Sequence, residues 1–424
     1  MSVTAVVGGQ WGDEGKGRVV DLLGQDADLI IRFNGGANAG HTVMNELGTF
    51  KMHLVPCGIF NPGATVVIAN GVMLDLEVLA TELNEIIAAG VDVENRLLIS
   101  PRCHVVMPYH KLLDGLCEEA KGAQSIGTTR RGIGPAFADK VSYNGIRLAD
   151  MADDDVFRDK LETQLLLKNK LIEALGGEAL DADEILTTYR ERYQALVPFI
   201  CEPFDIIQEA MAGGRRVLLE GAQGAMLDTD WSAYPYCTAA SPLAGASAAG
   251  AGIPPTRLDD IICVVKAYST RVGNGPLPTE LHGEQGDALR EAGQEYGATT
   301  GRPRRCGWFD AEVVRFTCTL NGATELALTR LDVLDHFETL RISTGYRLDG
   351  QPVSYVACDA RMLERCEPVL EEHAGWKCPT RDVRSFGELP AAAQSYVERI
   401  EELIGVPIKT VCVGPEREQR FSRA

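Results

Sequence analysis

A glycine-dense turn between a predicted strand and a predicted helix constrains this chain more than any other feature. The residues GGQWGDEGKGR at 8–18 follow the β-branched run VTAVV at 3–7 and lead into the apolar-periodic RVVDLLG. A strand that runs into such a turn and then into a helix places several backbone N–H groups and the positive end of a helix dipole at one point. The turn is therefore predicted to bind an anion such as a phosphate.

The turn differs from the standard phosphate loop of nucleotide-hydrolysing enzymes. That loop needs four residues between its first glycine and a Gly-Lys pair, and a Ser or Thr must follow. Here Gln10 takes the place of the first glycine and Gly17 that of the hydroxyl, although Lys16 supplies the phosphate-binding charge. A Mg²⁺ ion would need another oxygen, and Asp13 inside the turn is the candidate. A plain glycine-rich connection with solvated Asp13 and Glu14 is the alternative.

Charge and composition limit which molecules such a protein can bind. The chain has 424 residues and a net charge of −19, so we expect it to repel nucleic acid and anionic membranes. It has no signal-peptide pattern and no apolar run near the ~18 residues that a spanning helix needs. Its 12 cysteines include no CxxC pair, which argues against zinc and is typical of free thiols in a reducing compartment. We expect a soluble, cytoplasmic protein.

Strand-like and helical patterns alternate along the whole chain. Near-continuous apolar strands between helices predict an α/β fold with a large, mostly parallel sheet covered on both faces. The charged residues and helix formers at 151–200 predict a helical excursion from this sheet. The sequence shows no linker that would separate domains, so we predict one domain over 1–424. The expected strands are 3–7, 28–33, 64–70, 96–100, 215–220, 259–269, 325–329 and 408–413, and the expected helices are 73–89, 109–121, 153–175, 181–195, 311–320 and 388–404.

The loops after these strands carry further candidates, because doubly wound sheets bind ligands at the carboxyl ends of their strands. NGGANAGHT at 34–42 surrounds His41 with glycines and asparagines. We favour a phosphate donor or acid over an ordinary exposed histidine in this loop, since such loops often carry chemistry. EGAQG at 220–224 places the amide of Gln223 at the tip of a turn, where it can hold a planar base.

Two stretches rich in hydroxyls, glycines and arginines predict additional anion sites. In SIGTTRRGIGP at 125–135 the candidate phosphate donors are Thr128, Thr129 and Arg131, although a turn with solvated arginines is nearly as plausible. TTGRPRRCGW at 299–308 is a compact basic cluster in an acidic chain, and guanidinium groups match carboxylates or phosphates bidentately. Its arginines are Arg302, Arg304 and Arg305. This second cluster favours an anionic substrate over a solvated basic patch.

A carboxylate after a late strand indicates which nucleotide base is bound. Asp332, in TRLDVLD at 329–335, can accept hydrogen bonds from the N1–H and the N2 amino group of guanine. Adenine offers no such pair of donors, so this position would select GTP over ATP. VGPER at 413–417, after the last predicted strand, is a plausible wall of the same pocket.

Taken in order, these loops resemble those of the adenylosuccinate synthetase family over nearly the whole chain. The resemblance rests on QWGDEGKG, NAGHT, IGTTxRGIGPA, EGAQG, YPYxT, KAYxTRVGxGPxPTEL, EYGATTGRxRRxGW, LDVLD, GVPI and VGPER. It implies a GTP-dependent carbon–nitrogen ligase of the AMP branch of purine biosynthesis, which joins IMP and L-aspartate through 6-phosphoryl-IMP and releases adenylosuccinate, GDP and phosphate. It also implies Mg²⁺, a homodimer and a sheet related to the P-loop NTPase class.

The resemblance assigns roles to matching positions. Asp13 would remove the N1 proton of IMP and, with the Gly40 carbonyl, ligate Mg²⁺, while His41 would stabilise the charge that develops on phosphoryl transfer. The positions for IMP are Asp13, Lys16, Asn38, His41, Thr129, Gln223, Thr238 and Arg302, and those for L-aspartate are Thr299, Thr300, Arg302 and Arg304. The positions for GTP are Gly12, Glu14, Gly15, Lys16, Gly17, Gly40, Thr42, Arg304, Arg330, Leu331, Asp332, Cys412, Val413 and Gly414.

One departure and two alternatives stay open at this point. Tyr143 stands where the family commonly has an arginine that reaches across the dimer to the IMP phosphate, and the sequence does not decide whether Arg130 or Arg147 compensates. A relative that acts on a 2-amino purine nucleotide such as dGMP is the second hypothesis, against which the retention of Asp13 argues. A nucleotide-dependent switch protein is the third, and it would leave the arginines of 299–308 without a purpose.

Overall fold

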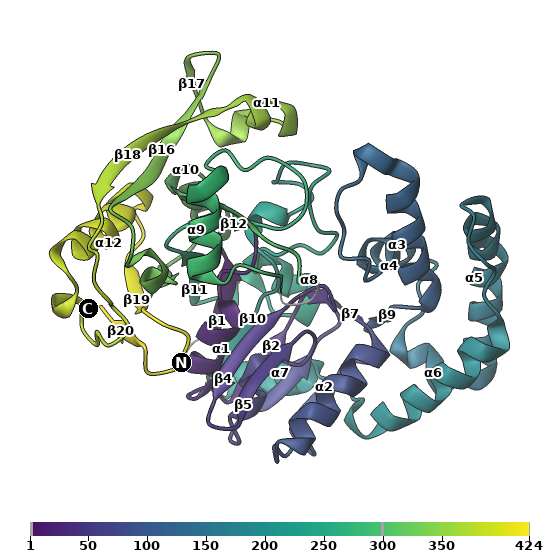
Figure 1. Cartoon of the computed structure of the whole chain (residues 1–424). Coiled ribbons are helices and arrows are strands. Elements are labelled where there is room, and N and C mark those ends of the chain that lie inside the picture. The colour runs from purple at the N-terminus through teal and green to yellow at the C-terminus, as the bar shows by residue number, and fades with distance from the viewer. Residues whose placement is uncertain (1–2, 298–300, 424) are drawn as a thin grey trace.

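A nine-stranded sheet forms the centre of the computed structural model, which describes residues 3–297 and 301–423 (Figure 1). Its strands are β1 Val3–Gly8, β2 Leu29–Arg32, β6 Thr65–Ile68, β8 Leu97–Ile99, β10 Val217–Glu220, β11 Asp260–Lys266, β15 Glu325–Thr329, β19 Ile408–Cys412 and β20 Arg420–Ser422. They follow the order β20-β19-β15-β11-β1-β10-β2-β6-β8, and all neighbouring pairs are parallel except β19-β20. The predicted α/β class with a large, mostly parallel sheet is confirmed.

Successive side chains of the strands enter different cores, as the two-residue period of a strand requires. Ile30 packs on one face with helices α1 (Lys16–Gly24) and α2 (Leu76–Ala88), whereas its neighbour Ile31 packs on the other face with α7 (Phe204–Ala212). Burial on both faces explains why these strands read as continuous apolar runs. The sheet is thus covered on both sides, and its strand ends and loops are left to form a site.

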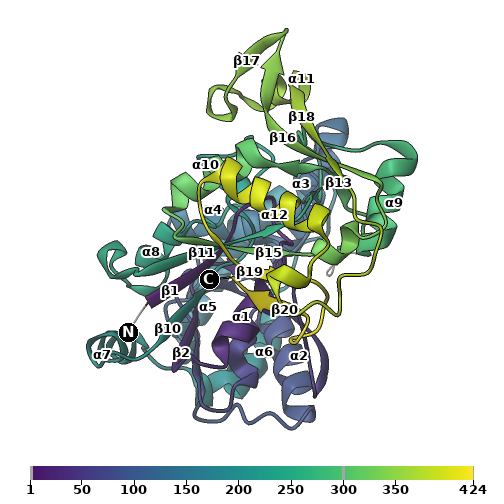
Figure 2. The same ribbon diagram turned by 90° about the vertical axis from the view of Figure 1, so that its left-hand side faces the viewer.

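The other helices extend these layers. A third core joins β11, β15 and β19 to α10 (Ala311–Asn321) and α12 (Ala391–Ile404). The remaining helices are α3 Pro108–Lys121, α4 Ile133–Val141, α5 Asp154–Ala174, α6 Ala182–Leu196, α8 Ser247–Ala251, α9 Gly283–Gly293 and α11 Ala360–Arg365. The region 151–200, predicted as a helical excursion, contains α5 and α6, which pack on each other and lie to one side of the sheet (Figures 1 and 2).

Short strands outside the central sheet complete the structure. They are β3 Gly35–Gly36, β4 His41–Asn45, β5 Gly48–Met52, β7 Val72–Leu74, β9 His104–Val105, β12 Ser269–Arg271, β13 Arg305–Gly307, β14 Phe309–Asp310, β16 Thr339–Leu348, β17 Gln351–Val353 and β18 Glu367–Ala374. β4 and β5 form an antiparallel hairpin, and β16 pairs with both β17 and β18 in an arm that reaches out from the body of the protein (Figures 1 and 2).

Several predicted boundaries are wrong for local reasons. The helix expected over 73–89 begins only at Leu76, because Val72–Leu74 pair as a strand and Asp75 caps the helix through the N–H groups of Glu77 and Val78. The strand expected over 259–269 is two strands, β11 and β12. The β16–β18 arm was not predicted, since β18 is largely exposed and neither β16 nor β18 contains an apolar run. Among the described residues, no helix is both long and apolar enough to cross a membrane.

Candidate active site

The turn between β1 and α1 is held by a carboxylate from its own sequence. The buried side chain of Glu14 accepts the backbone N–H groups of Gln10, at 3.1 Å, and Gly12, at 2.8 Å, and lies 2.5 Å from Lys16 Nζ. Helix α1 starts after Gly15, which is in the left-handed conformation and provides no side-chain cap. The first N–H groups of the helix are therefore available to a ligand. The sequence thus folds into a pre-organised turn of the anion-binding kind.

Asp13 lies in this turn in a left-handed conformation, with φ of 58°. Its side chain is 28% exposed, and Oδ2 lies 2.8 Å from Nε of Arg304. Arg304 also donates to Oε2 of Glu295 at 2.6 Å, and Glu295 pairs with Lys266 at 2.8 Å. Asp13 and Arg304, which are far apart in the sequence, are therefore neighbours in the structure, and a buried carboxylate fixes the arginine.

His41 was predicted to lie in a loop, but it is the first residue of strand β4. Its Nδ1 lies 2.6 Å from Oε1 of Glu220, the last residue of β10, and the same oxygen accepts from Arg32 at 2.8 Å. Gly17 of α1 lies so close that a Cβ there would be 2.6 Å from Cβ of His41, so only glycine fits. The ring is therefore held from two sides.

The charges around His41 fix its protonation state. Burial and the neighbouring Arg32 lower the pKa of His41 to about 4. Burial by itself would raise the pKa of Glu220, but the hydrogen bond from His41 and the charge of Arg32 lower it to about 2. At neutral pH the neutral ring donates its Nδ1–H to the Glu220 carboxylate, which leaves Nε2 as the ring nitrogen available to a ligand.

A loss of stability in mild acid is expected from this arrangement. The folded-state pKa of His41 lies below its ordinary value of 6.5, so its contribution to stability is present above pH 6.5 and is lost as the pH falls towards about 4. The loss is at most about 1.4 kcal/mol per pH unit for one group. Calorimetric melting of the wild type and of His41→Asn at stepped pH checks this, and equal pH dependence of the two proteins would contradict it.

Residues predicted to contact IMP line one cavity of about 460 Å³, the size range of small-molecule sites. The lining includes Asp13, Lys16, Asn38, Gly40, His41, Thr129, Gln223, Thr238 and Arg302. Gln223 donates to Oδ1 of Asn38 at 3.0 Å, and Asn38 donates to Thr238 Oγ1 at 3.5 Å. The other amide atom of Gln223, Oε1, is buried and has no hydrogen-bond partner among the described residues, so it suits a polar ligand atom.

Arg302 joins two of the predicted segments. Its Nη2 donates to the carbonyls of Gly127 and Thr128, at 3.2 and 3.3 Å, so the arginine of the 299–308 cluster contacts the loop that carries Thr129. Thr299 and Thr300, predicted to contact L-aspartate, lie outside the described residues. Arg305 instead forms an ion pair with Glu280, away from the cavity lining.

The predicted guanine pocket lies beyond the lining of this cavity. Asp332, in the turn after β15, has a buried Oδ1 without a partner in the parts of the chain that the structure describes, while Oδ2 pairs with Arg381 at 3.1 Å. Arg18 of α1 donates to the carbonyl of Gly414, which brings the turn after β19 to the helix that begins at the phosphate loop. A free carboxylate oxygen beside this turn is what a guanine edge requires.

The other residues predicted to contact GTP are distributed around the same turn. Arg330 precedes Asp332 with φ of 63°, and its Nη2 donates to the Gly293 carbonyl at 2.9 Å. Leu331, Cys412 and Val413 are buried, and Thr42 is exposed on β4. The GTP positions therefore run from the α1 turn to the ends of β15 and β19.

Sequence reasoning missed the buried partners of the site. Glu220 was visible as the first letter of EGAQG, and a carboxylate at the end of an apolar strand was the signal that could have identified it. Cys57 completes this group: its N–H donates to Oε2 of Glu220 at 2.7 Å. Possible metal-ligand atoms of His41, Cys57 and Glu220 lie within 4.8 Å of one another, but the Arg32 guanidinium already pairs with Glu220 and disfavours a cation.

Known proteins resemble this chain over nearly its whole length. The adenylosuccinate synthetase family model matches residues 5–421. An adenylosuccinate synthetase of Dehalococcoides mccartyi is 50% identical over 420 residues, 99% of either chain. One of Geobacillus kaustophilus is 48% identical over 420 residues, 99% of this chain and 98% of its own.

Solved structures show the same fold. The fully ligated adenylosuccinate synthetase from Plasmodium falciparum matches with a TM-score of 0.94 and 34% identity over 100% of both chains. Cyanophage S-2L succinoaminodeoxyadenylate synthetase, bound to dGMP and dATP, matches with a TM-score of 0.62 and 21% identity over 99% of this chain and 95% of its own, which shows a shared fold. Because the family model and the half-identical relatives both span nearly the whole sequence, this chain belongs to the adenylosuccinate synthetase family.

Proposed function

We propose that the protein joins IMP to L-aspartate at the expense of GTP and releases adenylosuccinate, GDP and phosphate. The observation that carries the proposal is a single cavity lined by a carboxylate in the phosphate-loop turn (Asp13), the loop lysine (Lys16), a neutral histidine (His41) and an amide with an unpartnered oxygen (Gln223). Family membership supports the same reaction and disfavours both a switch protein and an enzyme for 2-amino purine nucleotides.

The reaction follows in two steps. Asp13 takes the N1 proton of IMP, which moves electron density to O6, and O6 attacks the γ-phosphorus of GTP as the bond to the β-phosphate oxygen breaks. His41 and Lys16 line the same cavity and would stabilise the negative charge that develops on phosphoryl transfer. The amine of L-aspartate then bonds to C6, phosphate leaves with O6, and the amine gives up a proton. Arg302 and Arg304 are the cations for the aspartate carboxylates.

The donor set of the cavity fits Mg²⁺. Asp13 and Gly40 line the same cavity, and a carboxylate with a backbone carbonyl are the hard oxygen ligands that this ion prefers. Arg304 pairs with Oδ2 of Asp13, so Oδ1 is the oxygen left for the ion. Asp13 and Gly40 would hold the ion, which would neutralise charge on the phosphates of GTP. Glu14 is excluded from this set, because its oxygens already bind Lys16 and the N–H groups of the turn.

We also propose a cytoplasmic homodimer. Tyr143 supports an interface on the α4 side, because its side chain is 97% exposed at the end of this helix. Arg130 pairs with Glu119 on its own chain, so it does not replace the missing arginine in this arrangement. Sedimentation equilibrium tests the dimer.

The test of the function is formation of adenylosuccinate, followed by its ultraviolet absorbance, with IMP, L-aspartate, Mg²⁺ and either GTP or ATP. We expect turnover with GTP and little with ATP. Binding of GTP without aspartate-dependent turnover would reject the ligase and support the switch protein, whereas turnover with dGMP in place of IMP would support the 2-amino purine enzyme.

Asp332→Asn is expected to weaken GTP binding and to relax its preference over ATP. The amide keeps one acceptor but brings an N–H₂ group towards the donors of guanine, so discrimination should fall by about tenfold to a hundredfold. Ratios of kcat/KM for GTP and ATP measure the change. The matched control is Asp335→Asn, since Asp335 binds Trp376 and Thr380 inside the protein and its loss should alter thermal stability without altering the ratio. An unchanged ratio in Asp332→Asn removes Asp332 from the base pocket.

A further inference from the structure

The β4–β5 hairpin, which begins with His41, is attached to the protein at both ends by buried carboxylates. Glu220 binds the His41 ring at the first end. At the second end, just after β5, Glu82 of α2 accepts the backbone N–H groups of three consecutive residues, His53, Leu54 and Val55. The site described above uses Glu220 but gives no role to Glu82.

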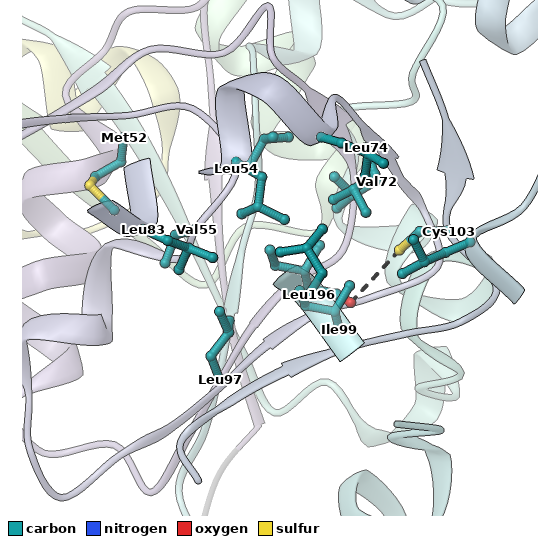
Figure 3. Close-up of a cluster of buried hydrophobic side chains, with 14 of the residues drawn as sticks. Met52, Leu54, Val55, Val72, Leu74, Leu83, Leu97, Ile99, Cys103 and Leu196 are labelled. Carbon is teal, nitrogen blue, oxygen red and sulfur yellow. Dashed lines mark hydrogen bonds between the residues drawn. The ribbon is translucent and has the colours of Figure 1, made fainter. Parts of the chain in front are cut away.

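The buried carboxylate of Glu82 serves as acceptor for the backbone of the segment after β5. Its side chain is 4% exposed, and its carboxylate lies 3.1 Å from the N–H groups of both Leu54 and Val55. The side chains of these residues point into the apolar core, where Figure 3 shows Val55 beside Leu83. Their N–H groups therefore lack water, and a carboxylate replaces it as acceptor.

The same segment also contacts His41, through Cys57 and Glu220. Two residues after Val55, the N–H of Cys57 donates to Oε2 of Glu220 at 2.7 Å, and Oε1 of Glu220 lies 2.6 Å from His41 Nδ1. The thiol of Cys57 lies 3.6 Å from the same ring nitrogen. A shift of residues 53–57 would thus move Cys57 and take one of its hydrogen-bond donors away from Glu220.

We propose that Glu82 is a positioning residue for His41: its carboxylate fixes the segment 53–57, which sets Glu220 and Cys57 and so aims Nε2 of the ring at the transferred phosphate. The proposal rests on the proposed role of His41 in phosphoryl transfer. Glu82 acts through the backbone and touches neither substrate. The expected consequence of its loss is a slower chemical step with unchanged substrate binding.

The energetics separate this role from a structural one. Burial raises the pKa of Glu82 to about 7, although the three N–H groups and the charge of Arg32 on β2 act in the opposite direction. Among the ionisable groups near the segment, His53 also faces Arg131 and Glu85. Because this folded-state pKa lies above the ordinary value, the stabilising contribution of Glu82 is present at low pH and lost as pH rises through 7. Above pH 7 a neutral amide avoids the cost of the buried charge but offers one acceptor oxygen in place of two, so we expect a displaced segment in a protein that still folds.

The experiment compares Glu82→Gln with Glu85→Gln at pH 8 in the full-length protein. Glu85 is exposed on the same helix and loses the same charge in its variant. Its charge acts on His53, but among the described hydrogen bonds it accepts none from residues 53–55, so it controls for the loss of charge alone. We expect kcat of Glu82→Gln to fall by about tenfold to a hundredfold with KM for IMP and GTP within about twofold, and melting temperature to stay near the wild type. Glu85→Gln should match the wild type.

A readout without turnover completes the test. The Nδ1 proton of His41, in its short hydrogen bond to Glu220, should give a downfield proton resonance that is absent in His41→Asn, and Glu82→Gln should shift it. An unshifted resonance with unchanged kcat overturns the positioning role while leaving the ligase intact. A wild type that forms no adenylosuccinate rejects the function itself. If Glu82→Gln fails to fold, Glu82→Asp, which keeps the charge but shortens the reach, is read by the same criteria.

Discussion

Asp13→Ala is expected to lower kcat by about a thousandfold or more while the protein still folds. IMP presents its N1 proton to a base before O6 can attack phosphorus, and Asp13 is the carboxylate in the phosphate-loop turn that lines the cavity. Single-turnover formation of adenylosuccinate at saturating IMP, GTP and L-aspartate measures the chemical step. Retention of more than a few per cent of wild-type kcat would reject the assignment of Asp13 as the base.

Two further variants separate chemistry from backbone effects. Asp13 has φ of 58°, a conformation that asparagine tolerates better than alanine, so Asp13→Asn removes the charge with less backbone strain. Both variants should lose activity to a similar extent if the charge matters. Asp26→Ala is the matched control, because Asp26 is exposed beyond α1 and should keep wild-type kcat.

The local part of the site could be predicted from the sequence. The order of strand, glycines and helix at residues 3–24 determines the turn by itself, because each piece depends on neighbours in the chain. The candidate loops also follow, since the ends of parallel strands meet at one edge of a sheet. His41, Gln223 and Thr238 come from three separate segments and line one cavity.

The partners of these residues could not be predicted, because they depend on long-range packing. Glu220 meets His41 across 179 positions, and only the pairing of β10 with β2 brings its strand beside Arg32. Glu220 has this role because it is buried: its carboxylate accepts the Nδ1–H of His41 and so selects the tautomer of the ring. Likewise Glu295 gave no sign in the sequence that it would hold Arg304.

These buried carboxylates also explain how an acidic chain holds a cationic site. Glu14, Glu220 and Glu295 each contact a buried cation, Lys16, Arg32 and Lys266 respectively. Each pair keeps a positive group in place without solvent, at a desolvation cost that good geometry offsets. An arriving phosphate or carboxylate then meets charges that need little rearrangement, which is the arrangement that favours transition-state stabilisation.

His41→Asn is expected to lower kcat by about a hundredfold to a thousandfold with little change in KM for GTP. The asparagine amide stands near the position of Nδ1 and can still donate to Glu220, so the buried carboxylate keeps its partner. What the variant removes is Nε2, the nitrogen available to the transferred phosphate. The loss should therefore appear in the chemical step and not in folding.

Two comparisons make the result decisive. His41→Ala removes both ring nitrogens and leaves Glu220 with one donor fewer, so it should lose thermal stability as well as kcat. His282→Asn, at an exposed histidine, should match the wild type in both. If His41→Asn keeps wild-type kcat, Nε2 has no role in phosphoryl transfer, and the hydrogen bond to Glu220 serves only to close the hairpin onto the sheet.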